Sequence, residues 1–222
     1  PEWNNLRQLK KEREVVGIYI SGHPLDDFKK EIKWFTNADL SQLKDLKPWI
    51  NKNLSLAGII NDFQHLESRS GKGWGRFTLE DFSDQYEFRI FGEEYLKFKH
   101  FLDFNRFICI KINIREGWRN QETGRLTDPR IQFINFEMLH DSLSKNSKKL
   151  TLQLDIRQLE SESIQNLKKE LRAFSGDKPL YFDIIDPKKQ LKLTLPSRKH
   201  KVAISQELLS HLEEKKWHYK LN

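Results

Sequence analysis

Five segments in which apolar and polar residues alternate, all between residues 53 and 139, constrain the fold more than any other feature of this sequence. Alternation with a period of two is typical of β-strands that have one buried and one exposed face. A stretch with helical spacing, GEEYLKFKHFL, separates the third segment from the fourth. The expected strands are NLSLAGIINDFQHL (53–66), GRFTLEDF (75–82), YEFRIFG (86–92), FICIKINI (107–114) and RIQFINFEML (130–139).

Residues 49–142 are therefore predicted to form a small barrel. Five strands with a helix after the third is the element order of the OB-fold. Gly58 lies in the middle of the first strand, where such a barrel needs a bend or a bulge. The segment ESRSGKGWG contains three glycines and is predicted to be the flexible loop between the first two strands.

The residues before the barrel show helical periodicity. Apolar residues at helical spacing predict one helix over residues 5–20 and a second within DDFKKEIKWF (26–35). Gly22 is suited to end the first helix, and Pro24 is suited to begin the second. A short third helix is expected in DLSQLKDL (39–46), so residues 1–48 are predicted to be a helical connector.

The last third of the chain alternates between strand and helix patterns. DSLSKNSKK (141–149) is polar, and we expect a linker there. The pattern then reads strand, helix, strand, strand, helix, which is typical of a compact α+β module over residues 143–222. The predicted fold class is mixed: a helical N-terminal connector, a five-stranded OB-fold β-barrel and a small α+β C-terminal domain.

Positive charge is unevenly distributed along the chain, whose formal net charge is +7. Residues 143–222 contain 17 basic and 10 acidic side chains, whereas residues 49–142 contain 13 and 14. Within the barrel, basic residues gather in the loops next to Trp74 and Trp118, and acidic residues gather between positions 80 and 94. This segregation favours one basic edge that follows a phosphate backbone, with solvated loop tips as the alternative.

The sequence offers little for catalysis, and we expect no cofactor and no metal site. Seven histidines show no zinc-binding spacing, and SGKGWG lacks the spacing of a phosphate-binding loop. Glu80, Asp81 and Asp84 form an acidic group of the kind that holds Mg²⁺, although surface acids at a strand end are the simpler interpretation. Cys109 lies among isoleucines and is predicted to be a buried apolar residue, which suits a reducing cytoplasm. No apolar run reaches the ~20 residues that span a membrane.

Aromatic and cationic residues recur where an OB-fold holds a single strand, which it does by stacking on bases and tracking phosphates. Trp74 lies in the loop between strands one and two, where its alternative role is to plug an end of the barrel. Trp118 lies between two arginines after strand four. The predicted nucleic-acid-binding residues are Arg69, Lys72, Trp74, Arg76, Arg89, Phe91, Arg115, Trp118 and Arg119.

The segment EREVVGIYISGHPLDDF (12–28) is followed in order by LAGII, RFTLEDF and FRIFGEEY, and later by LYFDI and LKLTLPSRKHKVAISQELLSHLEE. Together these motifs resemble the C-terminal part of the bacterial DNA polymerase III alpha subunit family. In that family the polymerase active site lies far upstream of the matched region. The resemblance therefore implies that this segment is not an enzyme by itself, although it belongs to a DNA-directed DNA polymerase.

The resemblance also implies partners. The OB-fold is expected to contact single-stranded template DNA, and the tail domain is expected to dock the tau subunit of the clamp loader. The family's sliding-clamp peptide is expected upstream of Pro1, since TLQLDIR (151–157) matches it only in part. Because the barrel is nearly neutral, we expect a weak contact that gains strength from tethering to the polymerase.

Two other interpretations remain open at this point. One is an RNA-binding appendage of an aminoacyl-tRNA synthetase, in which the GHPL segment (22–25) has no place. The other is a protein–protein adaptor whose barrel touches no nucleic acid. The excess positive charge of the tail fits either duplex phosphates or an acidic protein surface, and it resides largely in Lys188, Lys189, Lys192, Arg198, Lys199 and Lys201.

Overall fold

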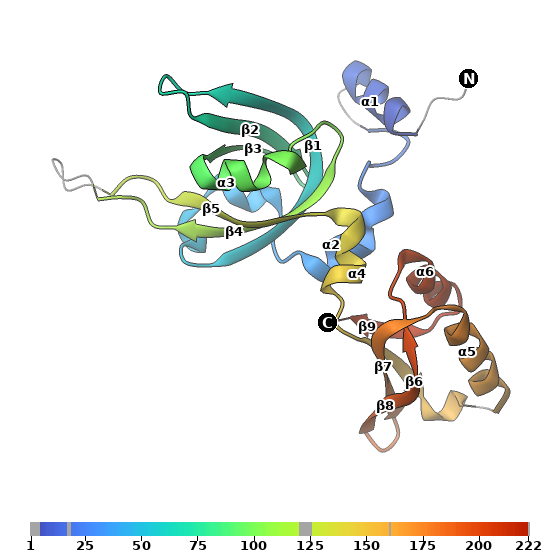
Figure 1. Ribbon diagram of the computed structural model, residues 1–222. Helices are drawn as coiled ribbons and strands as arrows, with labels where there is room; N and C mark the ends of the chain where they lie inside the picture. The colour runs from blue at the N-terminus through green and yellow to red at the C-terminus, as the bar shows by residue number, and fades with distance from the viewer. Residues whose placement is uncertain (1–4, 17–18, 120–125, 160, 222) are drawn as a thin grey trace. The chain divides into compact units, whose positions relative to one another are not determined.

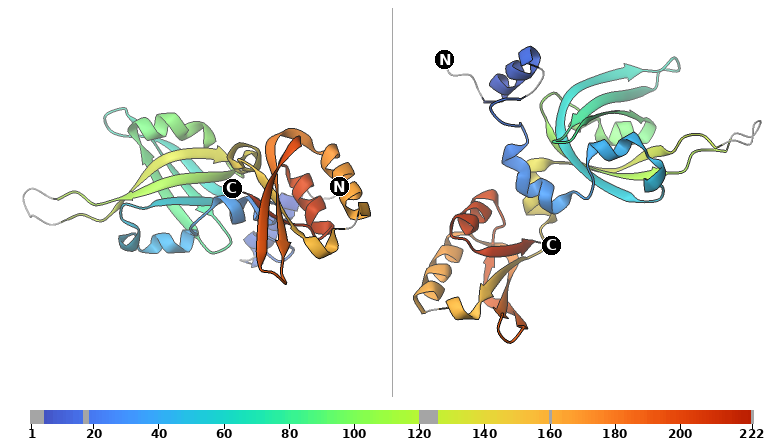
Figure 2. Two further views of the ribbon diagram at one scale, coloured as in Figure 1. Left: turned by 90° about the horizontal axis from the view of Figure 1, so that it is seen from below. Right: turned by 180° about the vertical axis from the view of Figure 1, so that it is seen from behind.

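The computed structural model of the chain divides into two compact units, Pro1–His140 and Asp141–Asn222. The first unit contains a five-stranded sheet and the second a four-stranded sheet (Figure 1). Together with the helices that flank each sheet (Figure 2), this arrangement confirms the predicted mixed fold class. The described residues are 5–16, 19–119, 126–159 and 161–221.

The five-stranded sheet is antiparallel throughout, with the strand order β3-β2-β1-β4-β5. The helix α3 (Gly92–Phe98) follows β3, as the sequence predicted, and a 3₁₀ turn, η4 (Lys99–Phe101), continues it. No strand ladder joins the two edge strands, so the barrel is open between β3 and β5. The strands are β1 (Asn53–Glu67), β2 (Gly73–Glu80), β3 (Gln85–Phe91), β4 (Phe107–Arg115) and β5 (Arg130–Met138).

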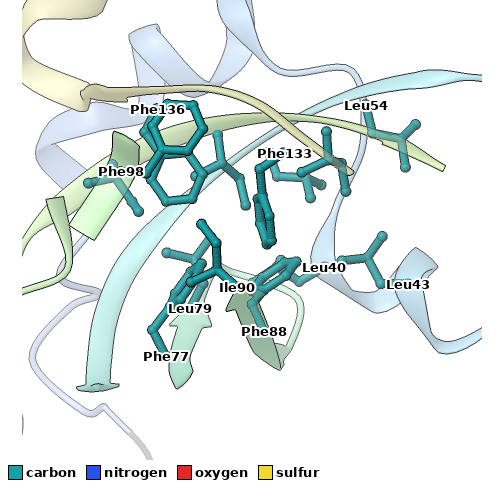
Figure 3. Packing of buried hydrophobic residues seen from close by; sticks show 14 of the residues in the cluster. Leu40, Leu43, Leu54, Phe77, Leu79, Phe88, Ile90, Phe98, Phe133 and Phe136 are labelled. Atoms are coloured by element: carbon teal, nitrogen blue, oxygen red, sulfur yellow. The ribbon is translucent and has the colours of Figure 1, made fainter. Parts of the chain in front are cut away.

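Aromatic rings from both halves of the curled sheet meet in the core (Figure 3). Phe77 of β2 stacks on Phe88 of β3, with ring centroids 5.1 Å apart. Across the interior, Phe88 meets Phe133 of β5 edge to face at 5.8 Å, and Phe136 stacks on Phe98 of α3 at 4.5 Å. These contacts hold β3 and β5 together through side chains in place of backbone hydrogen bonds.

Gly58 marks the bend that curls the sheet. A Cβ at this position would lie 2.4 Å from the carbonyl oxygen of Glu80, so only glycine lets β2 approach so closely. Two residues later the pairing of β1 with β2 shifts register between Ile60 and Asp62. The predicted bend in the first strand is therefore a close approach followed by a bulge.

The first N-terminal helix ends earlier than predicted, whereas the second covers the predicted residues 26–35 but begins as a 3₁₀ turn. The first, α1, covers Asn5–Val16, and the second is a 3₁₀ turn, η1 (Asp26–Phe28), that runs into α2 (Lys29–Phe35). Between them the backbone amide of His23 donates to Asp26 at 2.6 Å, while His23 Nδ1 accepts from the amide of Leu25 at 3.1 Å. Both hydrogen bonds close a local turn at the GHPL segment.

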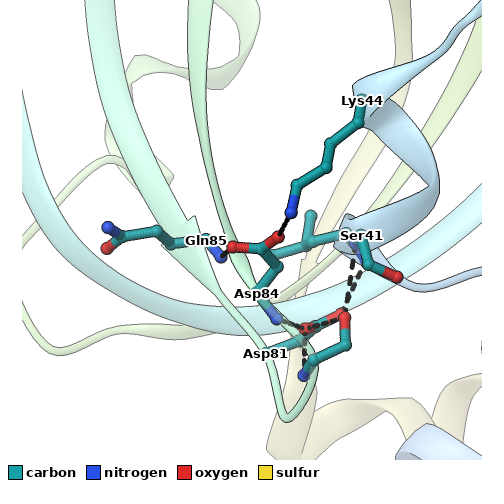
Figure 4. Close-up of polar contacts among 7 residues, drawn as sticks. Ser41, Lys44, Asp81, Asp84 and Gln85 are labelled. Carbon is teal, nitrogen blue, oxygen red and sulfur yellow. Dashed lines mark hydrogen bonds and ion pairs between the residues drawn. The ribbon is translucent and has the colours of Figure 1, made fainter.

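The third predicted helix is replaced by two 3₁₀ turns, η2 (Leu40–Lys44) and η3 (Lys47–Trp49). The turn between β2 and β3 holds η2 in place (Figure 4). Asp81 accepts hydrogen bonds from the amides of Leu40 and Asp84, and Lys44 forms an ion pair with Asp84. The hydrogen bonds that Asp84 accepts from Lys44 and from the amide of Gln85, together with the charge of Lys44, lower the pKa of Asp84. Of the three acids that suggested a Mg²⁺ site, Asp81 and Asp84 therefore bind backbone amides and a lysine, and Glu80 accepts a hydrogen bond from Asn61 Nδ2.

The second unit has the strand order β8-β7-β6-β9, in which β6 and β7 are parallel. The segment expected to be a linker contains a short helix with buried Ser142 and Leu143. Gly176, expected to end a helix, lies inside β7, and the last strand was not predicted at all. The turn η5 (Leu139–Asp141) spans the boundary between the two units. The elements of the second unit are α4 (Ser142–Asn146), β6 (Leu150–Asp155), η6 (Ile156–Gln158), α5 (Ser161–Ala173), β7 (Ser175–Asp186), β8 (Leu191–Val202), α6 (Gln206–Glu214) and β9 (His218–Leu221).

Across the described part of the chain, every helix is too short or too polar to cross a membrane.

Candidate nucleic-acid interface

The outer face of β1, β2 and β3 carries three rows of side chains, each formed by residues that lie directly opposite one another on neighbouring strands. The alternation in β2 and β3 buries the side chains of Phe77 and Phe88. The residues next to them in each strand, at positions 76, 78, 87 and 89, remain accessible, as the sequence predicted. The rows are Leu66–Trp74–Phe91, Gln64–Arg76–Arg89 and Asp62–Thr78–Glu87.

The first row ends in an aromatic platform. The rings of Trp74 and Phe91 stack with centroids 5.2 Å apart and an interplanar angle of 19°. Trp74 is half-buried, whereas Phe91 remains 56% exposed. Trp74 lies within β2 and not in the loop where it was predicted, and its ring lies on the outer face beside Arg76, not in an end of the barrel. Flat exposed rings of this kind are the surfaces on which unpaired bases stack.

The second row supplies positive charge, but one carboxylate partly neutralises it. Arg76 and Arg89 are direct cross-strand neighbours. Glu87 lies 3.5 Å from the Arg76 guanidinium and accepts hydrogen bonds from Arg89 Nε and Nη2 at 3.2 and 3.1 Å. Two guanidinium groups thus share one carboxylate, and the row keeps a net charge of about +1. A phosphate group at this position would compete with Glu87 for the two guanidinium groups.

A groove of about 710 Å³ runs between the two edge strands, where the barrel is open. Glu94 of α3 reaches into it and accepts a hydrogen bond from the backbone amide of Phe133 at 3.2 Å. Burial raises the pKa of Glu94, while this hydrogen bond and the charge of Arg130 oppose the shift. The groove is lined on the β3 side by residues 86–89 and 91, and on the β5 side by residues 129–133.

The hairpin between β4 and β5 carries a second aromatic and cationic pair. Trp118 is 65% exposed, and the guanidinium of Arg130 lies 4.0 Å from its ring centroid. This cation–π contact holds the Trp118 ring beside the mouth of the groove, which Arg130 lines. Trp118 and Thr127 are joined by two hydrogen bonds of 2.8 Å: the Trp118 amide donates to Thr127 Oγ1, and the Thr127 amide donates to the Trp118 carbonyl.

The predicted site residues fall into three places. Trp74, Arg76, Arg89 and Phe91 form one continuous cluster on the outer face of β2 and β3. On the β4–β5 hairpin lie Arg115, which donates to Gln132 at 2.8 Å, and Trp118 and Arg119. The tip of the β1–β2 hairpin holds Arg69 and Lys72, both exposed. Both hairpins project from the same end of the sheet in each view (Figures 1 and 2).

Sequence reasoning missed three residues that line the groove: Glu94, Arg130 and Gln132. Arg130 is the first residue of β5 and lies opposite Arg115. Its position as the first residue of the last predicted barrel strand was the available signal in the sequence. The groove itself is formed by strand edges that are far apart in the sequence, so no local pattern indicated it.

Known proteins to which this chain is similar in sequence carry the same name. Residues 150–222 match the model of the DNA polymerase III alpha subunit, C-terminal domain. The DNA polymerase III subunit alpha of Saccharopolyspora erythraea is 25% identical over 88% of this chain, and that of Borreliella burgdorferi is 30% identical over 88%. The chain spans only 16% and 17% of the length of these relatives.

Among solved structures, an aspartyl-tRNA synthetase from Leishmania major Friedlin aligns with 47% of this chain and 21% of its own length. The TM-score is 0.32 and the sequence identity is 10%, so this likeness supports no inference.

Proposed function

The chain matches the C-terminal region of bacterial DNA polymerase III alpha subunits, and from this premise we propose that it acts in DNA replication as a part of such a subunit that carries no polymerase active site. In this proposal the five-stranded unit binds single-stranded template DNA and the second unit docks the tau subunit of the clamp loader. The sequence motifs that carry the family resemblance extend through both units, which is what supports assigning a role to each.

The placement of an aromatic stack and an aromatic–cationic pair on opposite sides of the open groove carries the proposal of DNA binding. Trp74 with Phe91 offers a stacking platform on the β3 side, and Trp118 with Arg130 offers another on the β5 side. Arg89 and Arg130 line the groove between them. An unpaired strand that crosses the groove would stack bases on the rings, while the two guanidinium groups follow its phosphates.

The contact is proposed to be weak on its own. Glu87 neutralises part of the charge of Arg76 and Arg89, and Glu94 adds a second carboxyl group beside Arg130. A binding module tethered to a polymerase that already holds the DNA gains an effective concentration of about millimolar. A weak site therefore suffices to keep the template near the enzyme.

Binding of fluorescein-labelled oligo-dT, followed by anisotropy at low salt, tests the proposal. The double variant Trp74→Ala/Arg76→Ala removes one ring and one cation from the outer face, and we expect affinity to fall at least tenfold, since each stacked base contributes ~1–3 kcal/mol. The matched control Phe104→Ala/Lys111→Ala also removes an exposed ring and an exposed cation, but at positions outside the platform and the groove.

Equal affinities for the wild-type chain and the Trp74→Ala/Arg76→Ala variant would show that the assigned face is wrong. Oligo-rU in place of oligo-dT separates the RNA-binding interpretation, because a single-stranded DNA site should not prefer RNA. A chain that binds neither oligonucleotide at low salt would favour the adaptor interpretation.

The docking role of the second unit is proposed from its match to the family model and from its excess of basic side chains. A pull-down of purified tau subunit with the whole chain tests it. We expect tau to be retained by the wild-type chain, and its absence from the bound fraction would overturn this half of the proposal.

A further inference from the structure

The second unit exposes an apolar row along its edge strand. In the four-stranded sheet, β8 pairs only with β7, and no other strand of the described chain covers its outer edge. Leu191, Leu193 and Leu195 lie on one face of this strand and are 62%, 57% and 41% exposed. Exposed apolar residues on a free strand edge are a template for pairing with another chain.

This row continues the buried face of the sheet. Leu195 lies opposite Phe182, which lies opposite Leu152, and Leu152 is fully buried. In the same way, Leu193 lies opposite Ile184, which lies opposite Leu154. The apolar core of the unit therefore extends past its own strands to an edge at which burial is incomplete. One more strand beside β8 would complete it.

Lysine and proline residues often protect an edge strand from pairing with another chain, but in β8 neither protects the leucine row. Lys192 bonds to buried Asp183 of β7 at 2.8 Å, on the face opposite the leucines, so its charge does not guard the row. Pro196 lacks an amide hydrogen and ends the stretch that could pair, which leaves Leu191–Leu195, about 16 Å of strand at 3.3 Å per residue.

Charge at both ends of this stretch indicates the chemistry of the partner. Two exposed lysines precede it in the β7–β8 turn, and three exposed basic residues follow Pro196 in the same strand. A nucleic acid would meet these charges but would leave the leucines exposed, whereas a peptide strand would satisfy both. The basic residues are Lys188, Lys189, Arg198, Lys199 and Lys201.

We propose that the free edge of β8 binds an extended segment of a partner protein as a fifth strand, and that this segment has apolar residues at every second position and acidic residues at both ends. The inference rests on the proposed docking role of the second unit and names the surface that performs it. Backbone hydrogen bonds supply affinity, and the leucine row and the flanking charges supply specificity.

The test measures tau binding to the whole chain by biolayer interferometry. Leu193→Asp places a charge in the middle of the row, and we expect tau affinity to fall at least tenfold. Leu193→Thr keeps a side chain that favours strands and should reduce affinity less. Leu96→Asp, at a leucine of α3 that is 64% exposed, is the matched control and should bind like the wild type. Thermal melts confirm that each variant is folded.

Amide hydrogen exchange on the complex supplies a second readout, with slowed exchange expected across Leu191–Leu195. If tau binds the wild type and Leu193→Asp equally and these amides stay unprotected, the edge assignment is wrong while the docking role stands. If tau does not bind the wild type, both fail. If Arg198→Ala/Lys199→Ala lowers affinity for duplex DNA and leaves tau binding unchanged, the surface serves nucleic acid and the inference is overturned.

Discussion

Removal of Glu87 should strengthen the binding of single-stranded DNA, because this carboxylate holds two arginines that would otherwise meet phosphates. Its oxygens lie 3.5 Å from the Arg76 guanidinium and 3.1 Å from that of Arg89. Glu87→Gln keeps the shape of the side chain and removes the charge. The pairs are at least one-third exposed, so losing them should cost less than ~1 kcal/mol of folding stability.

The size of the effect follows from counterion release. On single strands each phosphate that a protein neutralises steepens the fall of log K with log salt by ~0.7. Two released arginines would thus steepen the slope by up to about 1.4. For each added contact, affinity would fall about 2.6-fold more between 50 and 200 mM salt. The variant should therefore bind more tightly than the wild type at low salt and lose this advantage at high salt.

Anisotropy titrations of oligo-dT at four salt concentrations between these limits measure both affinity and slope. Asp62→Asn is the matched control, since Asp62 belongs to the same cross-strand row as Glu87 and pairs with Thr78 across β1 and β2. It removes the same formal charge from the same face without releasing an arginine. Equal slopes for Glu87→Gln, Asp62→Asn and the wild type would refute the reasoning.

Three further predictions concern single residues. Gly58→Ala should lower the free energy of unfolding in urea by about 1–3 kcal/mol, because its Cβ would meet a backbone oxygen 2.4 Å away; Gly71→Ala, with open space around it, tests only the effect of its positive φ. Trp118→Ala should weaken oligo-dT binding by ~1–3 kcal/mol without changing the melting temperature. Burial raises the pKa of Glu94, so its neutral form is favoured in the folded chain, and the stability that this form contributes is lost as pH rises from the ordinary value of 4.5 through the raised pKa of the folded chain. Glu94→Gln should therefore be more stable relative to the wild type at pH 7 than at pH 4, as measured by urea unfolding.

The strands could be predicted because their signal is local. In β2 and β3, residues that alternate between apolar and polar types have one face buried, and this face contains Phe77, Phe88 and Ile90. The same alternation identified Arg76 and Arg89 as outward residues. Glu87, Arg76 and Arg89 all belong to one predicted hairpin, so their proximity could be expected. The specific contact of Glu87 with Arg76 could not be predicted, because the register of the strands has to be known before cross-strand neighbours can be assigned.

Other features depended on contacts that a single segment does not show. The polar composition of residues 141–149 indicated a linker, but the structure has the short helix α4 there. The side chain of Leu143 is buried, which stabilises this helix. The four-residue strand β9 is too short for its alternation to stand out, and its pairing with β6 brings together segments almost 70 residues apart. The groove depends on which two strands remain edges, and that is a property of the whole sheet.

The opening between β3 and β5 links the fold to the proposed function. In a closed barrel, the backbone groups of these two strands would pair, and no groove would separate the Trp74–Phe91 stack from the Trp118–Arg130 pair. In this chain, aromatic side chains, chiefly Phe88 and Phe133, fill the interior between β3 and β5. At the surface the two strands remain apart and form the rim of a groove that Arg89 and Arg130 line. Because Glu87 and Glu94 limit the positive charge at this rim, an unpaired strand held there would exchange readily. In the proposed function, this exchange would let template DNA move past the unit, which tight binding would oppose.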